Sequence, residues 1–191
     1  MRQKLIRRRT NVVRQAHPDK SGPGGSGFST PHLIMKQALV AIDETAARFI
    51  ASQRVARLAT ADPSGAPHVV PICFVLDGVG DGARLYTALD SKPKRVQGHG
   101  LKRVRNIVSN PRVALVFDRY REDWNRIGYV LVTGVAALVE DQAERAAAEA
   151  LLRAKYRQYR SMLAPGSTII RIDPVRVVAW GDLEPDPPGA R

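Results

Sequence analysis

Residues 54–89 read RVARLATADPSGAPHVVPICFVLDGVGDGARLYTAL, in which apolar runs alternate with short segments of turn residues. Its three runs rich in Val, Ile, Leu and Ala, at 54–61, 68–76 and 83–89, have the composition of β-strands. The two connectors, DPSG at 62–65 and DGVGDG at 77–82, contain the Asp and Gly residues that tight turns use, because glycine accepts a positive φ. The stretch therefore predicts three strands in an antiparallel meander.

The flanking sequence adds strands and helices. Apolar residues at three- and four-residue steps predict an amphipathic helix over 36–53 that covers one end of the sheet. A second helix is predicted at 102–109, ending before Pro111, because proline disfavours helix in the residue before it. The capping box Asp141-Gln-Ala-Glu144 opens a third helix that is expected to run to about residue 162. Further strands are predicted at 112–118, 128–139 and 168–180, the last bent at Pro174.

Six strands with mostly hairpin-length connections, together with three helices, predict a mainly β chain of the α+β kind. The expected architecture is a closed or half-closed antiparallel barrel with helices at its ends. Residues 68–76 and 112–117 are apolar at almost every position, so both faces of these strands are expected to be buried. A helix or a second subunit must then cover the outer face, which predicts a homodimer.

Composition excludes several protein classes. The 191 residues are 44% hydrophobic and 25% charged, which is typical of a globular chain and not of a disordered one. No apolar run approaches the roughly 20 residues that a membrane-spanning helix needs. The single cysteine, Cys73, excludes an internal disulfide and a CxxC metal cage and fits a reducing compartment, so a cytoplasmic protein is expected.

The net charge of +12 is unevenly distributed. Residues 1–30 contain seven bases and one acid, or +6, and residues 92–126 contain ten bases and three acids, or +7. Glycines at 22, 24 and 27 spell GxGxxG, but no strand precedes them, so a flexible linker is preferred to a phosphate loop. The expected organisation is a basic, Gly-rich leader at 1–30, one domain at 31–183 and a frayed tail at 184–191.

Residue patterns of hydrolytic and phosphotransfer enzymes are missing, namely HExxH, GxxxxGK[ST] and GxSxG. The histidines at 17, 32, 68 and 99 have no metal-ligand spacing. His68 opens a buried strand and is interpreted as a structural residue before a ligand contact. Cys73 is interpreted as a small core residue. No metal site and no catalytic side chain are predicted.

The basic region that follows the third strand offers binding chemistry instead. Backbone N–H groups at the start of helix 102–109 can receive an anion, and neighbouring lysines and arginines can surround it. Ser91 and Thr87 would add hydroxyl donors. A solvated basic face is the alternative, and composition does not decide between the two.

Eight short motifs, in this order, resemble the split-barrel flavin and deazaflavin reductases related to pyridoxamine 5'-phosphate oxidase (PPOX class). They are Arg57-Leu-Ala-Thr60, Pro67-His-Val-Val-Pro71, Leu85-Tyr-Thr87, Lys92-Pro-Lys94-Arg95, Arg105-Asn-Ile107, Asn110-Pro-Arg-Val-Ala-Leu115, Asp123-Trp124 and Pro174-x-Arg176-Val. The resemblance covers about residues 39–180 and is greatest to the subgroup that uses coenzyme F420. It implies a six-stranded antiparallel split β-barrel of the FMN-binding type, dimeric, with the cofactor in a groove between the subunits.

The resemblance also assigns cofactor-binding residues. The ring and ribityl chain are expected along two strands, at Val70, Pro71, Tyr86 and Thr87. The phosphate or tail carboxylates are expected on the basic turn and helix, and one aromatic residue is expected to approach from the partner subunit. The residues of the basic turn and helix are Ser91, Lys92, Lys94, Arg103 and Asn106, and the aromatic residue is Trp124. An apparent insertion at 95–100 leaves open whether Lys94 or Arg103 is the main phosphate ligand.

The implied activity is an F420-dependent oxidoreductase that transfers a hydride between reduced deazaflavin and a small organic substrate. A cofactor ring that performs hydride chemistry explains why no catalytic dyad is found. The local charge of +7 suits the oligoglutamate tail of F420 better than the single phosphate of FMN. FMN on the same fold is the first alternative and a nucleic-acid-binding module the second; a haem-binding relative is also compatible with the barrel. The C-terminal arginine motif of the vitamin oxidases is missing, so pyridoxamine phosphate is not expected as substrate.

Overall fold

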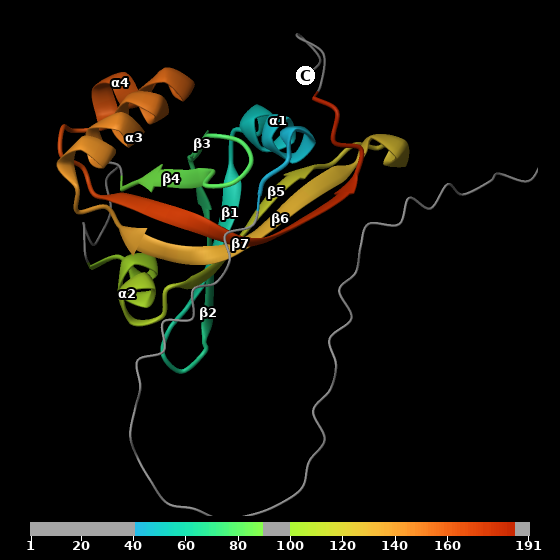
Figure 1. The fold of residues 1–191 in the computed structure, drawn as a ribbon. Helices are drawn as coiled ribbons and strands as arrows, with labels where there is room; N and C mark the ends of the chain where they lie inside the picture. The colour runs from blue at the N-terminus through green and yellow to red at the C-terminus, as the bar shows by residue number, and fades with distance from the viewer. Residues whose placement is uncertain (1–40, 90–99, 186–191) are drawn as a thin grey trace, which may run out of the picture. The chain divides into compact units, whose positions relative to one another are not determined.

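A computed structural model describes residues 41–89 and 100–185 of the chain (Figure 1). These residues form one antiparallel sheet with short helices around it. The elements are α1 (Glu44–Ser52), β1 (Ala56–Ala61), β2 (Pro67–Ile72), β3 (Val75–Asp77), β4 (Arg84–Ala88), α2 (Lys102–Ser109), β5 (Arg112–Arg119), the 3₁₀ helix η2 (Trp124–Arg126), β6 (Gly128–Leu138), α3 (Gln142–Lys155), α4 (Tyr159–Met162) and β7 (Ile169–Gly181).

The sheet has the strand order β2-β1-β5-β6-β7-β4-β3, and every neighbouring pair is antiparallel. Its centre is the long β6–β7 pair, which runs from Gly128 opposite Gly181 to Leu138 opposite Ile170. The register of this pair shifts between Thr133 and Gly134, where Gly134 lies opposite Pro174. The bend predicted at Pro174 is therefore confirmed as a β-bulge, the place where a residue without an N–H can be accommodated.

The run 68–76 was expected to be one strand, and this prediction is wrong. The run divides into β2 and β3, which lie at opposite edges of the sheet (Figure 1). Hydrogen bonds from outside the ladder stabilise the joint: the Tyr156 hydroxyl accepts the Phe74 N–H at 3.0 Å, and the Thr87 hydroxyl donates to the Cys73 carbonyl at 2.7 Å. The sheet consequently has seven strands instead of six, while the mainly β half-barrel with flanking helices is confirmed.

Two predicted helices also have different ends. The first begins at Glu44, because Asp43 caps it by accepting the Ala46 N–H at 2.8 Å and Ile42 forms a β-bridge with Gly80. Residues 36–40 of the predicted helix lie outside the described residues. The helix expected to run to about residue 162 ends at Lys155, and a short α4 follows the break at Tyr156, whose hydroxyl contacts the β2–β3 joint.

The core consists of two clusters of buried side chains. The larger lies between the sheet, α1 and α2 and contains Phe49, Phe74 and Phe117, while the smaller lies under α3 and includes Tyr86 and Leu152. Each such side chain contributes about 1.5–3 kcal/mol through removal from water. Among the described helices, none has the length and apolar character needed to cross a membrane.

Burial on both faces, expected for 68–76 and 112–117, is not reached within one chain. β5 alternates between buried and half-buried residues, and on β2 the outward side chain of Val69 is 59% exposed. The sheet therefore has an inner face in the core and an outer face with exposed apolar side chains.

Candidate functional site

Two basic side chains lie near the beginning of β2. Lys102 and Arg103, in the first turn of α2, lie close enough to His68 for their positive charges to act on its imidazole. Burial, followed by these two charges, lowers the pKa of His68 below its ordinary value, so the ring is neutral at pH 7. Its Nδ1 is shielded from solvent and has no hydrogen-bond partner among the described residues. We call His68, Lys102 and Arg103 the α2 cluster.

The position of α2 is fixed from within the core. The buried side-chain amide of Asn106 donates to the Thr60 hydroxyl of β1 at 3.0 Å, and Val104 and Ile107 belong to the larger core cluster. Leu101, at the N-cap position, supplies no side-chain acceptor to the first turn. The first turn thus lies beside β2 with cationic side chains and without a capping side chain, which favours an anionic ligand.

An acidic residue close to Lys102, Asp62, has other partners. The Asp62 carboxylate, in the β1–β2 turn, accepts hydrogen bonds from the Ser64 hydroxyl at 2.6 Å and from the Ala66 N–H at 3.0 Å. These bonds, and to a lesser extent the charge of Lys102, lower its pKa. Asp62 therefore compensates the basic cluster only at a distance.

The outer face of the sheet has a hollow of about 400 Å³ over β1, β5 and β6. Its floor is a row of directly opposite residues in three neighbouring strands, Ala59, Ala114 and Thr133. At the two ends of this row are larger residues, Val69 on β2 and Arg176 on β7. Small side chains between larger ones create the depression, which we call the outer hollow.

Aromatic side chains lie farther along the same face. Tyr129 and Trp180 are opposite one another on β6 and β7, and their rings stack with centroids 5.7 Å apart. Asp118 lies next to Tyr129 in the register and forms an ion pair with Arg57. Trp180 is 53% exposed, so this face offers a ligand or a second protein chain both apolar and charged contacts.

A second hollow, of about 540 Å³, lies between α1 and the β3–β4 turn. Leu76, Val79 and Ala47 supply its apolar walls, and Glu44 and Arg48, 4.0 Å apart, form an exposed ion pair at its border. Because Arg48, the cation among the described residues that line it, is paired with a carboxylate, this hollow is less suited to an anionic ligand than the α2 cluster.

The residues expected to line a cofactor ring do not all face one space. Pro71 is exposed on the outer face, whereas Val70 packs into the larger core cluster. Tyr86 is buried under α3, and its hydroxyl donates to Glu144 at 2.9 Å. Burial is the main cause of the raised pKa of this hydroxyl. Thr87 is also buried and donates to the β2–β3 joint, so both hydroxyls have hydrogen-bond partners within the fold.

The residues expected to bind phosphate are partly outside the described ranges, namely Ser91, Lys92 and Lys94. Of the others, Arg103 is half-buried in the α2 cluster and Asn106 is buried against Thr60. Trp124 opens η2 and is 75% exposed. The structure thus brings Arg103 to His68, while the amide of Asn106 is occupied within the core.

Two features of the site were not predicted from the sequence. The sequence contains one indication of the outer hollow, because Ala59, Ala61 and Ala114 occupy outward strand positions where β-branched residues are more usual. His68 was judged structural, and nothing in its neighbours along the chain indicates that α2 lies beside it. Only the tertiary arrangement places Lys102 there.

The described residues contain another unusual cation, Lys155 at the end of α3. Burial, followed by repulsion from Arg54, lowers the pKa of its amine to about 8. Its Nζ lies 3.8 Å from the centroid of the Phe74 ring and has no hydrogen-bond partner among the described residues. The contact with the ring face partly offsets the loss of hydration.

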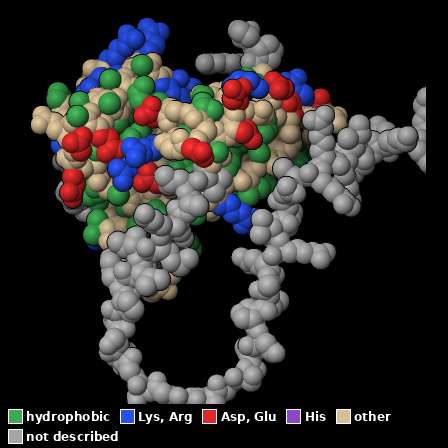
Figure 2. All heavy atoms as spheres, in the orientation of Figure 1, with side chains coloured by type: hydrophobic (Ala, Val, Ile, Leu, Met, Phe, Trp, Pro, Cys, Tyr) green, Lys and Arg blue, Asp and Glu red, His purple; other side chains and the backbone are tan. Residues whose placement is uncertain are grey.

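Other surface charges are mixed in sign. On the face that Figure 2 shows, acidic and basic side chains are interspersed, which is typical of a solvated surface. Within residues 41–89 and 100–185, no group of three or more His, Cys, Asp or Glu side chains is arranged to hold a metal ion.

Solved structures with the same fold come from several bacteria. The heme storage protein HutZ from Vibrio cholerae has a TM-score of 0.52 and 18% identity, covering 70% of this chain and 92% of that one. A conserved hypothetical protein from Mycobacterium tuberculosis has a TM-score of 0.58 and 19% identity, covering 76% and 88%. A heme binding protein from Mycobacterium smegmatis has a TM-score of 0.56 and 22% identity, covering 71% and 52%. At these identities the likeness concerns the fold alone.

Among curated proteins, none matches the chain. The family profile described as pyridoxamine 5'-phosphate oxidase matches residues 42–181, which include every strand of the sheet. The chain therefore belongs to the pyridoxamine 5'-phosphate oxidase family.

Proposed function

We propose that this protein is an oxidoreductase that binds coenzyme F420 and transfers a hydride between it and a small organic substrate. The observation that carries the proposal is the α2 cluster, where two cations lie beside a neutral imidazole whose Nδ1 lacks a partner. A phosphodiester or a carboxylate would give this nitrogen a partner, through a protonated ring, and would neutralise both cations.

The residues present fit an elongated anionic cofactor. The first turn of α2 would hold the phosphodiester, and Ser91, Lys92 and Lys94, which precede α2 in the sequence, are proposed to contact it or the tail carboxylates. Pro71 and the outer hollow offer the cofactor ring an apolar, small-residue surface on the outer face. When bound, F420 supplies the hydride donor and acceptor at its ring; the protein supplies orientation, charge and exclusion of water.

The outer face is proposed to be completed by a second copy of the chain. Val69, Tyr129 and Trp180 expose apolar surface there, and the Arg57–Asp118 pair adds polar contacts that are compatible with a two-fold interface. Trp124 is proposed to reach the cofactor of the partner protomer. Sedimentation that finds only a 21 kDa species at micromolar concentration would contradict the dimer.

Two other cofactors have specific support. The family profile favours FMN, which carries one phosphate and would use the same cluster. The heme proteins named above share the fold, and His68 is a neutral imidazole with an unpartnered nitrogen, the form that binds iron. The local charge favours F420 over both, because its tail carries several carboxylates.

The deciding experiment titrates the purified full chain with F420, FMN and hemin in parallel, following absorbance and fluorescence. Binding of F420 at micromolar concentration or below, weakened by added salt and by Lys92→Ala with Lys94→Ala, is the expected result. A yellow preparation with flavin absorption would select FMN, and a Soret band lost in His68→Ala would select haem. Absence of any F420 signal in absorbance, fluorescence and heat would refute the proposal.

A further inference from the structure

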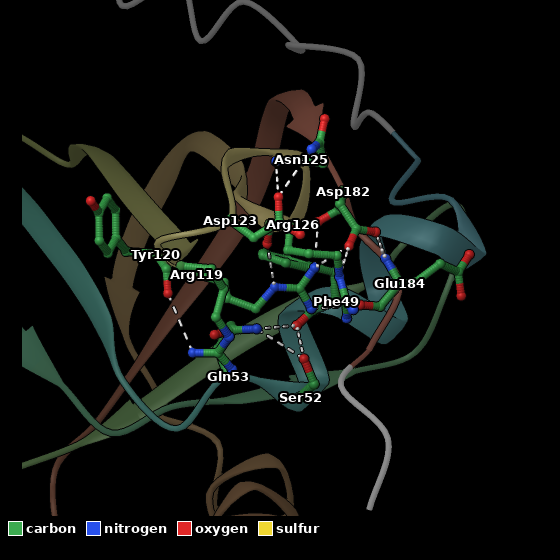
Figure 3. Close-up of polar contacts among 11 residues, drawn as sticks. Phe49, Ser52, Gln53, Arg119, Tyr120, Asp123, Asn125, Arg126, Asp182 and Glu184 are labelled. Atoms are coloured by element: carbon green, nitrogen blue, oxygen red, sulfur yellow. Dashed lines mark hydrogen bonds and ion pairs between the residues drawn. The ribbon is translucent and has the colours of Figure 1, made fainter. Parts of the chain in front are cut away.

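Arg119, the last residue of β5, is a buried cation with a complete set of partners. It is 7% exposed, and its guanidinium lies over the Phe49 ring of α1, 5.4 Å from the centroid. Nε donates to the Arg126 carbonyl at 3.1 Å, and Nη2 donates to the Asp182 carbonyl at 2.7 Å (Figure 3). Nη1 donates to the Glu184 carbonyl, and the Asp182 carboxylate lies 3.0 Å from Nη2.

These contacts connect segments that the sheet alone does not connect. The bond to the Arg126 carbonyl closes the turn between β5 and β6, and the bonds to residues 182 and 184 attach the chain after β7 to the same turn. Arg126 also donates from Nε to the Asp182 carboxylate at 2.8 Å. Arg119 therefore fixes the C-terminal end of the 120–126 turn, which we call the aromatic turn.

The other end of η2 is fixed as well. Asp123 accepts hydrogen bonds from both the backbone N–H and the side-chain amide of Asn125, each at 3.0 Å (Figure 3). The aromatic residues of the turn nevertheless point to solvent, since Trp124 is 75% and Tyr120 63% exposed. A firmly held backbone that presents large exposed aromatic rings is characteristic of a preorganised contact, because less ordering entropy is lost on binding.

The backbone at the end of β7 is shaped to reach Arg119. Gly128 and Gly181 lie opposite one another, and a Cβ on Gly181 would clash with the Ile127 carbonyl. Gly181 also has a φ of 82°, which favours glycine and turns the chain after β7. This close approach allows the Asp182 N–H to donate to the Ile127 carbonyl at 2.9 Å and brings the Asp182 carboxylate to the guanidinium.

We propose that Arg119 is a positioning residue that holds the aromatic turn in one conformation, so that Trp124 is preorganised for contact with the cofactor bound by the partner protomer. The inference rests on the proposed function for the identity of the ligand, but the conformational part stands on the contacts of Arg119 alone. A merely structural arginine would affect the stability of the protein without affecting how Trp124 moves or how tightly the cofactor binds.

The test uses the full chain with Trp180→Phe, which leaves Trp124 as the only tryptophan. In this background Arg119→Met is compared with Arg119→Lys and with Arg48→Met, a matched loss of an exposed cation on α1. Fluorescence anisotropy of Trp124 and the affinities for F420 and FMN are measured well below each melting temperature.

We expect Arg119→Met to lower the anisotropy of Trp124 and to weaken cofactor binding by about tenfold, with Arg119→Lys intermediate and Arg48→Met unchanged. Unchanged anisotropy, or unchanged affinity with only a lower melting temperature, would overturn the inference. If the parent chain binds neither cofactor, the proposed function fails while the anisotropy still decides whether Arg119 holds the turn. If Arg119→Met does not fold, Asp123→Ala loosens the same turn from its exposed end and must reproduce both effects.

Discussion

Arg119 and Arg126, which share Asp182, and the α2 cluster are two places where cations lie together, but the groups differ in their partners. Around Arg119, three backbone carbonyls and the Asp182 carboxylate accept from the guanidinium, so the protein itself satisfies the cation. In the α2 cluster, His68 has a buried Nδ1 without a partner in the described part of the chain, and Asp62 bonds to its own turn. Cations with such partners stabilise a fold, whereas a buried polar atom without a partner, such as the His68 Nδ1, indicates where a ligand is to be sought.

The affinity for F420 should change most when the two cations of the α2 cluster are removed. The double variant Lys102→Ala with Arg103→Ala should bind F420 roughly 100-fold more weakly, because each charged contact contributes about 1.5 kcal/mol. The matched control removes two exposed charges of the α4 region, Arg157→Ala with Arg160→Ala, and should have little effect. Isothermal titration at two salt concentrations provides the measurement. Equal losses in the two double variants would mean that only net charge matters.

A smaller effect is expected when Asp182, the counter-charge of Arg119, is neutralised. Asp182→Asn should lower the free energy of unfolding by about 2 kcal/mol at pH 7, because Arg119 keeps its carbonyls but loses its counter-charge. Burial opposes ionisation of Asp182, but the Glu184 N–H and the two arginines outweigh it and lower its pKa. The stabilisation is therefore present above about pH 4 and is lost as the pH falls further.

Urea unfolding of the parent chain and Asp182→Asn at pH 7 and at about pH 3 measures this difference. Glu44→Gln is the control, since its pair with Arg48 is exposed and contributes less than about 1 kcal/mol. If the two variants lose the same stability at pH 7, Arg119 does not depend on Asp182.

Lys155 is a cation of a third kind, with aromatic neighbours and no hydrogen-bond partner in the described ranges. Its pKa is about 8 in the folded chain against 10.5 for the ordinary amine, so the unfolded chain binds more protons between these values. Stability should consequently rise with pH across this window. Lys155→Met should be more stable than the parent by about 1 kcal/mol at pH 7, after allowance for partial exposure and for the ring contact. If unfolding curves give the same difference in stability between Lys155→Met and the parent at pH 7 and at pH 10, this explanation is contradicted.

The smallest effect concerns His68 itself. Its lowered pKa predicts that folding stability decreases as the pH falls below the ordinary histidine value of about 6.5. An anion bound in the α2 cluster should raise the pKa of His68, since it offsets the charges of Lys102 and Arg103. A proton NMR titration with and without inorganic phosphate measures the change, and His68→Gln identifies the resonance. A pKa that phosphate leaves unmoved would place the anion elsewhere.

Local signals in the sequence were sufficient for much of the fold. Alternation and turn residues located β1 and β4, Pro174 located the bulge, and the Asp141 cap located the start of α3, where its side chain accepts the Glu144 N–H at 2.7 Å. These features depend on residues within a few positions of one another, which is the range in which sequence patterns are informative.

Long-range contacts decided what was missed. The division at Cys73 and Phe74 depends on the hydroxyl of Tyr156, 82 residues away from Phe74, and no local pattern reports it. For the same reason the sequence did not indicate the contacts of Tyr86 and Asn106, because their partners Glu144 and Thr60 are distant along the chain. Composition identified the basic segment, but only the packing of α2 shows that Lys102 and Arg103 lie near His68.

Only Cys73 and Phe74 separate the strands at the two edges of the sheet. One residue inserted or deleted at this joint would reverse the inward and outward side chains of one edge relative to the other. Length differences in this protein's lineage should therefore accumulate in the turns at 62–66 and 78–83, where extra residues leave both edges in register. The spacing between Ile72 and Val75 should stay constant as the chain diverges.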